Sequence, residues 1–445
     1  MAGTYTTISL SAALGEMGRR LYDPDHVRWP ADELTVHIQQ ALRTYNALTN
    51  HFRAKTTFQT TLAEPFYDLQ TVCANLRGFT YTTQQAVAEL ARHLMEPAPD
   101  GNLWIGTEQY NLADLVDALQ TARDTFLLET GVIVTRSLLS VPAPAADGRV
   151  SLSEAIINLR RLAWKTGNGI TTVLRRDDNW GFTHYGKGYQ TASSAPPKAY
   201  SVGVTPPLIV ELAPVTNVAG TLDLLTIDRG ESVNLLDTTQ VLGVPDDWAW
   251  VVLFGALADL FSRDGLALDA ERSAYCDARW KHGIEMAKRA GVVLAGQVSG
   301  VSVELGSVSD ADLYDSAWMM VSGIPRRILT AGQTIVGLWP PPGVPPGGGN
   351  FTITLDVVRN APVPTATSDI LQIGPELLDD ILNYAQHLAL IKEGSQQISD
   401  AMALLNRFMG LCGTTVQIQK ASQPNDPAVV GQASQDTRVI AYEGT

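Results

Sequence analysis

An internal repeat is the feature that most restricts how this 445-residue chain can fold. The pattern DELTVHIQQALRTYNALTN matches ADLVDALQTARDTFLLETG when Glu33 is aligned with Asp114, an offset of 81 along the chain. In both copies, apolar residues recur at three- and four-residue steps, as on one face of an amphipathic helix. Asn50 and Gly131 follow the two copies, and both residue types commonly end helices. The repeat therefore predicts a duplicated helical unit.

Two further matches extend the repeat. TYTT occurs at Thr4–Thr7 and again at Thr80–Thr83, an offset of 76 along the chain. GALADLFSRDG at Gly255–Gly265 resembles YAQHLALIKEG at Tyr384–Gly394, an offset of 129. Each copy of the latter pattern follows a proline with acidic residues, which is typical of a helix start. Because β-prone sequence precedes each copy, we expect strands that lead into a pair of helices, used twice.

These patterns predict an α+β fold of duplicated helical units with short β-strand segments. Its expected core is a helix-bundle, adaptor-like core, from which extended loops and a C-terminal arm project. A third helix is expected at SLSEAIINLRRLAWKTG. The expected segments are helical unit copy 1 at 1–78, copy 2 at 79–148, a helix and extended polar loop at 149–206, β segments with a helix pair at 207–291, an irregular region with a Pro/Gly-rich linker at 292–349, a second copy of the β segments and helix pair at 350–414, and the arm at 415–445.

The charge balance restricts the partners. The chain has 46 acidic and 32 basic residues, a formal net charge of −14. Duplex binding needs clustered Lys and Arg, so a free-standing nucleic-acid binder is excluded, whereas an acidic wall can let DNA pass without retaining it. Cys73, Cys276 and Cys412 lie far apart in apolar settings, which favours free, buried thiols in a reducing compartment. We see no secretion signal, and the longest apolar run is too short to span a membrane.

One stretch, NWGFTHYGKGYQ, resembles a phosphate-binding P-loop. Gly181 is followed at the P-loop spacing by Gly186 and Lys187, but Gly188 stands where the motif has Ser or Thr. No buried strand precedes the stretch, and two prolines prevent a helix from following it. HExxH, GxSxG and CxxC motifs are absent and the histidines are scattered. We therefore expect no catalytic residue, no cofactor and no metal site, although a dispersed active site leaves no motif.

Basic and aromatic residues gather around this loop in an otherwise acidic chain. Arg and aromatic residues concentrate at protein interfaces, and they also contact nucleic-acid backbone and bases. A plain solvated loop, a subunit interface and a DNA or sugar contact all remain open, and we expect a protein neighbour before a phosphate. The predicted subunit or partner contacts are Arg175, Arg176, Trp180, His184, Tyr185, Lys187, Tyr189 and Lys198.

The ordered features resemble a known family. SLSAALGEMGRRLYDP, VRWPADELTVHIQQALRTYNALTNHFR and PFYDLQT look like the amino-terminal region of tailed-bacteriophage head-to-tail adaptor and neck (connector) structural proteins. VPDDWAWVVLFGALADLFSRDG is similar to the start of their later helical pair. The resemblance covers about half the chain in pieces, and the chain departs from it by its length, its duplications and its Pro/Gly linker. The matching residues are Trp29, Asp32, Glu33, Leu34, Ala41 and Tyr45.

The resemblance implies a non-enzymatic virion structural protein at the head–tail junction, assembled in the host cytoplasm. It would form a homo-oligomeric ring, expected to be twelve-fold, that connects the portal protein to a tail or nozzle protein. Duplex DNA would pass through the ring without specific binding, and no membrane would be involved. One alternative is a tail- or fibre-attached module that binds a host surface glycan. Another is a hydrolase with a dispersed site, which predicts paired carboxylates in a deep cleft.

Overall fold

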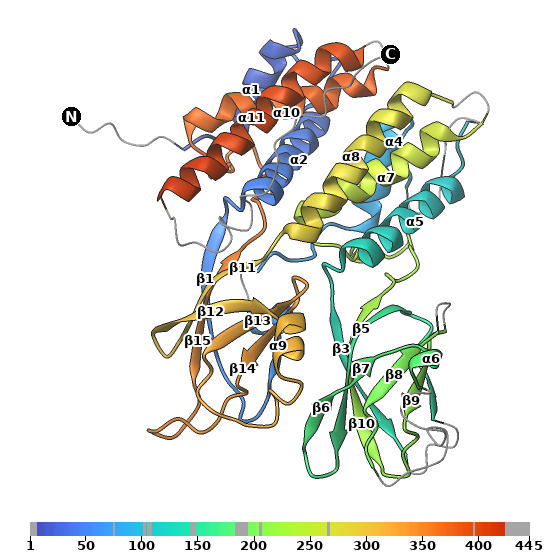
Figure 1. Cartoon of the computed structure of the whole chain (residues 1–445). Helices are drawn as coiled ribbons and strands as arrows, with labels where there is room; N and C mark the ends of the chain where they lie inside the picture. The colour runs from blue at the N-terminus through green and yellow to red at the C-terminus, as the bar shows by residue number, and fades with distance from the viewer. Residues whose placement is uncertain are drawn as a thin grey trace.

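The computed structural model describes residues 7–73, 76–100, 104, 109–142, 148–182, 195–203, 207–264, 268–394 and 397–422. Helices form one layer and strands form another (Figure 1). The fold is α+β, but the expected helix-bundle core with short strand segments is wrong. The described strands build a seven-stranded sheet and two four-stranded sheets. Local periodicity missed these sheets because their strands pair with segments far away in the sequence.

Eight long helices make up the helical layer in the described part of the chain. They are α1 (Leu10–Arg20), α2 (Ala31–Thr49), α4 (Thr83–His93), α5 (Leu112–Thr130), α7 (Ala249–Ser262), α8 (Ala270–Arg289), α10 (Pro375–Lys392) and α11 (Ile398–Ser422). The short helices are α3 (Leu69–Val72), α6 (Asn179–Phe182), η2 (Asp246–Trp248) and α9 (Val308–Tyr314). Within the described residues, no helix has the length and apolar character needed to cross a membrane.

The described strands form three sheets, and the same spatial order of strands occurs twice in them. The seven-stranded sheet runs β1 (Arg53–Gln59), β15 (Thr352–Val358), β11 (Val293–Val298), β12 (Val301–Ser307), β13 (Arg327–Ala331), β14 (Ile335–Trp339) and β2 (Phe66–Asp68). One four-stranded sheet runs β3 (Thr135–Val141), β10 (Gly220–Asp228), β5 (Ile156–Thr166) and β6 (Thr171–Val173). The other runs β7 (Arg175–Arg176), β8 (Ala199–Val202), β9 (Ile209–Ala213) and β4 (Arg149–Ser151).

The two four-stranded sheets together repeat the topology of the seven-stranded sheet. Only Leu174 separates β6 from β7, so these two strands take the place of β12. The parallel pairs lie at the same step of both orders, β12 with β13 and β7 with β8. The chain thus contains two units of one topology. We call residues 79–291 the inserted unit and residues 7–78 with 292–422 the outer unit, because the first interrupts the second.

The helices follow the same duplication. α1 and α4 both have 11 residues, and α2 and α5 both have 19. α2 packs on α10 and α11 as α5 packs on α7 and α8. Asn50 and Gly131 end α2 and α5, as predicted, and both are left-handed, with φ of 50° and 58°. Figure 1 shows the units side by side, each with its helices above its strands.

Backbone hydrogen bonds fix the register of the repeat. Leu371 N donates to Ile8 O at 2.9 Å, and Leu242 N donates to Tyr81 O at 2.8 Å. These two bonds are equivalent, with Leu371 matching Leu242 and Ile8 matching Tyr81. The match of Glu33 with Asp114 holds in space, because α2 and α5 begin and end at that offset. Leu242 and Leu371 have the offset of 129 found for the GALADLFSRDG match, whose Gly265 lies outside the described residues. In the TYTT match, residues 4–6 lie outside the described residues, and Thr7 is not equivalent to Thr83, because α1 and α4 align with Leu10 on Thr83.

Several segments differ from their expected structure. The third helix expected at SLSEAIINLRRLAWKTG is β5, because this segment pairs with β10 and buries Leu162 and Trp164. The irregular region expected at 292–349 contains β11 to β14 and α9. α11 continues to Ser422, so the arm expected from 415 is helical over its first residues, and residues 423–445 lie outside the described ones. The three cysteines are free and buried, as predicted.

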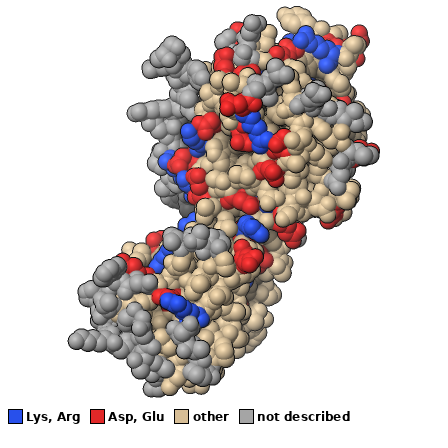
Figure 2. Space-filling view, turned by 90° about the vertical axis from the view of Figure 1, so that its right-hand side faces the viewer, with Lys and Arg blue, Asp and Glu red and all other residues tan. Residues whose placement is uncertain are grey.

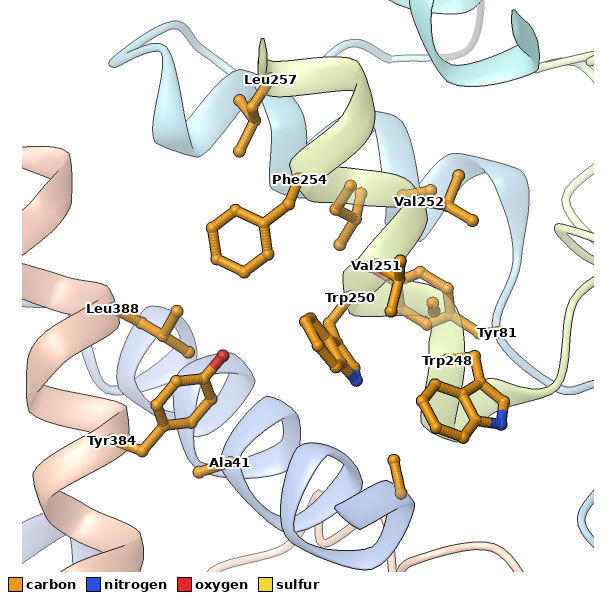
Figure 3. Packing of buried hydrophobic residues seen from close by; sticks show 14 of the residues in the cluster. Ala41, Tyr81, Trp248, Trp250, Val251, Val252, Phe254, Leu257, Tyr384 and Leu388 are labelled. Atoms are coloured by element: carbon orange, nitrogen blue, oxygen red, sulfur yellow. The ribbon is translucent and has the colours of Figure 1, made fainter. Parts of the chain in front are cut away.

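The hydrophobic cores show how the units join. Each unit has its own core on the inner side of its strands. The helical layer has one continuous core from both units, in which Trp250 and Phe254 of α7 approach Tyr384 of α10 and Ala41 of α2 (Figure 3). A further cluster lies between the strand regions of the two units. Both layers therefore hold the units together.

Candidate assembly interface

The helical layers meet where α8 of the inserted unit faces α10 of the outer unit. Tyr275 OH lies 2.6 Å from His387 Nε2, and Ala401 O lies 2.7 Å from His387 Nδ1. Burial lowers the pKa of His387 to about 3, although the bond to Ala401 opposes this shift. His387 is therefore neutral, so Nδ1–H donates to Ala401 and Nε2 accepts from Tyr275.

A buried arginine lies in the same contact. Arg279 Nη2 donates to Tyr384 OH at 3.0 Å across the units. Its guanidinium lies 4.9 Å from the ring centre of Trp250 and 5.6 Å from those of Phe254 and Tyr384. Cation–π attraction of this kind is worth about 2 kcal/mol when the cation is desolvated. Aromatic rings therefore compensate part of the cost of burying this charge.

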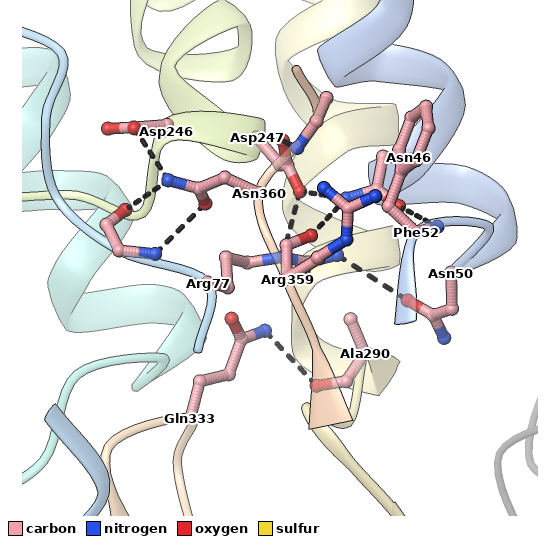
Figure 4. A network of polar contacts seen from close by, with 12 residues as sticks. Asn46, Asn50, Phe52, Arg77, Asp246, Asp247, Ala290, Gln333, Arg359 and Asn360 are labelled. Atoms are coloured by element: carbon pink, nitrogen blue, oxygen red, sulfur yellow. Dashed lines mark hydrogen bonds and ion pairs between the residues drawn. The ribbon is translucent and has the colours of Figure 1, made fainter. Parts of the chain in front are cut away.

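A polar network connects the units where α2 ends (Figure 4). Asp247 is fully buried and lies 3.0 Å from Arg77 Nε in an ion pair. Asn46 of α2 donates both to Asp247 and to Arg359 O. Asn360 Nδ2 donates to Asp246 at 2.8 Å. Asp246 and Asp247, which the sequence marks only as helix-start acids, thus link the inserted unit to α2 and to the chain after β15.

Phe66 of β2 carries the contact between the strand regions. Its ring lies 5.1 Å from the guanidinium of Arg136 on β3 and 5.2 Å from that of Arg161 on β5. Trp318 packs edge-on against it at 5.8 Å. Asp312 of α9 accepts from Arg161 Nε at 2.7 Å and from Trp318 Nε1 at 2.8 Å. The outer unit thus covers the outward face of the β3–β10–β5 sheet.

Charged groups are also buried between α2 and α4. Glu89 of α4 accepts a hydrogen bond from Tyr81 OH, and Arg43 of α2 lies over the Tyr81 ring at 4.7 Å. Burial raises the pKa of Glu89 to about 7, although Tyr81 and Arg43 oppose the shift. Burial also lowers the pKa of His93 to about 3, so this neighbour of α2 is neutral. Glu89 is therefore a buried carboxyl group, and its ionisation near neutral pH lowers the stability of the fold.

We expect Glu89→Gln to stabilise the fold at pH 8 and to have a smaller effect at pH 5. The pKa of Glu89 is 4.5 without the fold and about 7 within it, so folded stability falls as pH rises through this interval. Glutamine keeps an acceptor for Tyr81 and carries no charge. The free energy of unfolding, from urea denaturation, should rise by about 3 kcal/mol at pH 8 and about 1 kcal/mol at pH 5. Exposed Glu154→Gln is the control, and an equal gain at both pH values would contradict the assignment.

The contact between the units is head-to-tail rather than two-fold. In a two-fold contact, every pair of elements meets twice with exchanged roles. Here α2 of the outer unit meets α4 of the inserted unit, where Asp32 and Arg92 lie 3.9 Å apart. The exchanged pair is α1 with α5, and among the described residues no hydrogen bond, ion pair or ring contact joins those helices. Each unit therefore presents a different face to the other.

The sequence-predicted contact residues that the structure describes lie in β7, in α6 and just before β8 of the inserted unit. Arg175 and Arg176 form β7 and are exposed, and Arg175 N donates to the carbonyl oxygen of exposed Lys198 at 3.0 Å. The structure brings these three together. Trp180 belongs to α6, and its side chain is not among those described. The remaining predicted contacts lie outside the described residues: His184, Tyr185, Lys187 and Tyr189.

Sequence reasoning missed the residues that join the units. Phe66 lies in PFYDLQT, which contributes strand β2, and Asp312 lies in SDADLYD, which contributes most of helix α9. Neither pattern reveals a partner that is distant in the sequence. The duplication was the available signal, because it shows which positions of the two units are equivalent. Only the structure shows which of these positions are covered on one unit and exposed on the other.

The groove at the contact between the units bears on catalysis, and the arrangement of possible ligands bears on metal binding. A groove of about 430 Å³ runs between the units beside Phe66 and Arg136, and Asp68 is the one carboxylate among the residues that line it. This groove does not offer the carboxylate pair that a hydrolase of the dispersed type predicts. In the described part of the chain, no three His, Cys, Asp or Glu side chains gather as metal ligands. No protein-family model and no curated protein matches the sequence.

Proposed function

We propose that the protein is a non-enzymatic structural subunit that assembles into a ring with its own copies. The ring would lie at the head–tail junction of a tailed bacteriophage, as an adaptor, neck or collar. Its partners would be the portal protein on one side and a tail or nozzle protein on the other. Duplex DNA would pass through the ring without specific binding, in keeping with the net charge of −14.

The observation that carries this proposal is the head-to-tail contact between the two units. Contacts of this type leave one unmatched face at each end, and their repetition closes into a ring or continues as a filament. The polar groups of the contact serve to join the units: Arg77 pairs with Asp247, and Arg161 pairs with Asp312. The place in the virion comes from the sequence resemblance to adaptor and neck proteins.

The predicted contact loop supports the same proposal at the level of sequence. When α6 is aligned with α9, Asn179 on Val308, Tyr189 takes the sequence position of Trp318. Trp318 lies in the segment through which the outer unit contacts the inserted unit. We propose that the loop, with Arg175, Arg176 and Lys198 beside it, contacts the neighbouring chain or an adjoining ring protein.

Replacing both Tyr185 and Lys187 with alanine should weaken assembly and leave the fold of the single chain intact. The reason is that basic and aromatic side chains contribute strongly to protein interfaces. Sedimentation velocity compares the assembled fraction of the variant with that of wild type, and circular dichroism checks the fold. The matched control is Tyr314→Ala with Lys281→Ala, a pair that is exposed and lies outside the loop. Unchanged assembly in the loop variant would remove the loop from the contact.

Electron microscopy of virions with a labelled antibody against the chain tests the proposed place. Label at the head–tail junction supports it. Label on tail fibres, together with a glycan-array hit and a trimeric assembly, favours the alternative of a module that binds a host surface glycan. Tight binding of duplex DNA by the purified protein at physiological salt would contradict the role of a DNA channel.

A further inference from the structure

We infer that copies of this chain bind one another through the same contact that joins the two units within the chain. Each chain then supplies two successive units of the ring, and a second copy of the chain occupies each open end. The inference rests on the proposed ring and deepens it by naming the surfaces that meet. It follows from a comparison of equivalent positions, which are covered on one unit and open on the other.

The first comparison concerns α2 and α5. Arg43 on α2 lies over Tyr81 of the inserted unit, and Ala47, one turn further along, is 3% exposed. The equivalent residues on α5 are Asp124 and Leu128. Leu128 is 43% exposed. This stripe is thus buried on α2, where the inserted unit covers it, and exposed on α5, where no other described part of the chain covers it.

The second comparison concerns the start of the third long helix of each unit. Asp246 and Asp247 in the inserted unit are buried against the outer unit, where Asn46 and Asn360 bind them. In the register that matches Leu242 with Leu371, the equivalent residues are Pro375 and Glu376 at the start of α10, and both are exposed. This end of the outer unit is therefore open where its counterpart is covered.

The third comparison concerns the outward face of the sheets. In the inserted unit, Ala163 and Leu225 are buried on this face under Trp318 of the outer unit. In the outer unit, the outward row of the equivalent sheet is Thr57, Thr354 and Gln297, which pair in register across β1, β15 and β11. Thr57 and Gln297 are exposed. This polar face of the outer unit is thus exposed, whereas the equivalent sheet face of the inserted unit is covered by the outer unit.

Charge complementarity favours a second copy as the occupant. Asp117 and Thr121 are exposed on α5 on the same stripe as Asp124 and Leu128. Figure 2, which looks onto this end of the molecule, shows acidic side chains over its helical part, with basic ones among them. On α1, which lies at the other end of the molecule, Arg19 is largely exposed and pairs with Glu16 of its own helix at 2.5 Å.

Arg19 is equivalent to Arg92, which faces Asp32 across the units at 3.9 Å. The residue of α5 equivalent to Asp32 is Ala113, and the exposed acid one turn further along α5 is Asp117. We therefore expect Asp117 of one chain to face Arg19 of the next, in the arrangement that α2 and α4 adopt within the chain.

The test compares two exposed leucines, each changed to arginine in the full-length protein. Leu128→Arg places a large charged group on the proposed chain-to-chain stripe. Leu313→Arg is the matched control, because Leu313 is 85% exposed on α9, on the side of the outer unit that already faces its own inserted unit. We expect Leu128→Arg to raise the concentration needed for half-assembly by at least ~10-fold and Leu313→Arg to leave it unchanged. Mass photometry over a dilution series measures this concentration, and circular dichroism confirms the fold of both variants.

The outcomes separate this inference from the proposed function. If Leu128→Arg assembles as wild type does, and Thr354→Arg on the sheet face also does, the inference is overturned while a ring built through other surfaces survives. If wild type remains a single chain at all concentrations, the inference is overturned as well. If Leu128→Arg blocks assembly but antibody label is missing from the head–tail junction, the inference stands and the proposed place in the virion fails.

Discussion

Arg77→Met should lower the free energy of unfolding by about 3–5 kcal/mol, since it leaves a buried carboxylate without its partner. The side chains of Arg77 and Asp247 are 1% and 0% exposed. Burial raises the pKa of Asp247 and lowers that of Arg77, so each charge is held in place by the other against the cost of desolvation. Methionine has a similar length and keeps most of the packing, and therefore the loss reports mainly on the charge.

A double variant provides the control for this prediction. In Arg77→Met with Asp247→Leu, both charges are gone, and replacing a buried ion pair by apolar residues is often close to neutral. The double variant should therefore regain much of the stability lost by Arg77→Met alone, measured by urea denaturation at pH 7. A loss below about 1 kcal/mol in Arg77→Met would mean that Asp247 is protonated or solvated, and the ion pair would not be what joins the units here.

Phe66→Ala should cost about 3–5 kcal/mol, the range observed for removal of a buried aromatic ring. The ring is 4% exposed and lies between Arg136 and Arg161, so its removal takes away apolar packing and the cation–π contacts of two arginines. Tyr314→Ala is the matched control, because Tyr314 is 81% exposed on the nearby helix α9 and its removal should change stability by less than about 0.5 kcal/mol. Equal losses in both variants would show that the strand regions are not held together at Phe66.

The helices were the predictable part of the fold because their signals are local. Apolar spacing and the caps at Asn50 and Gly131 give the ends of α2 and α5 correctly. The segment that forms β5 shows the limit of this reasoning. Its sequence tolerates a helix, and pairing with β10, which lies far away in the sequence, decides its structure. Strand order depends on such distant pairings, and no periodicity within a segment specifies them.

The residues that join the units were not predictable from the sequence, and the contact role of the predicted residues stays a prediction. Basic and aromatic composition pointed to Arg175, Arg176 and Lys198, which the structure does bring together. Phe66 and Asp312 carried no such signal, because a buried contact residue resembles any core or helix-start residue in sequence. The repeat matched halves of units rather than whole units. The reason is that the inserted unit interrupts the outer one and separates α1 and α2 from α10 and α11 by most of the length of the chain.

The most direct test of the central claim is a cryo-electron microscopy reconstruction of the assembled protein, with the number of chains taken independently from its mass. The account predicts a ring with twice as many similar units as chains. The contact between neighbouring chains should superpose on the contact between the outer and inserted units, with α5 of one chain against α1 of the next. A two-fold arrangement, or a ring in which α5 and the outward face of β1, β15 and β11 stay exposed to solvent, would contradict it.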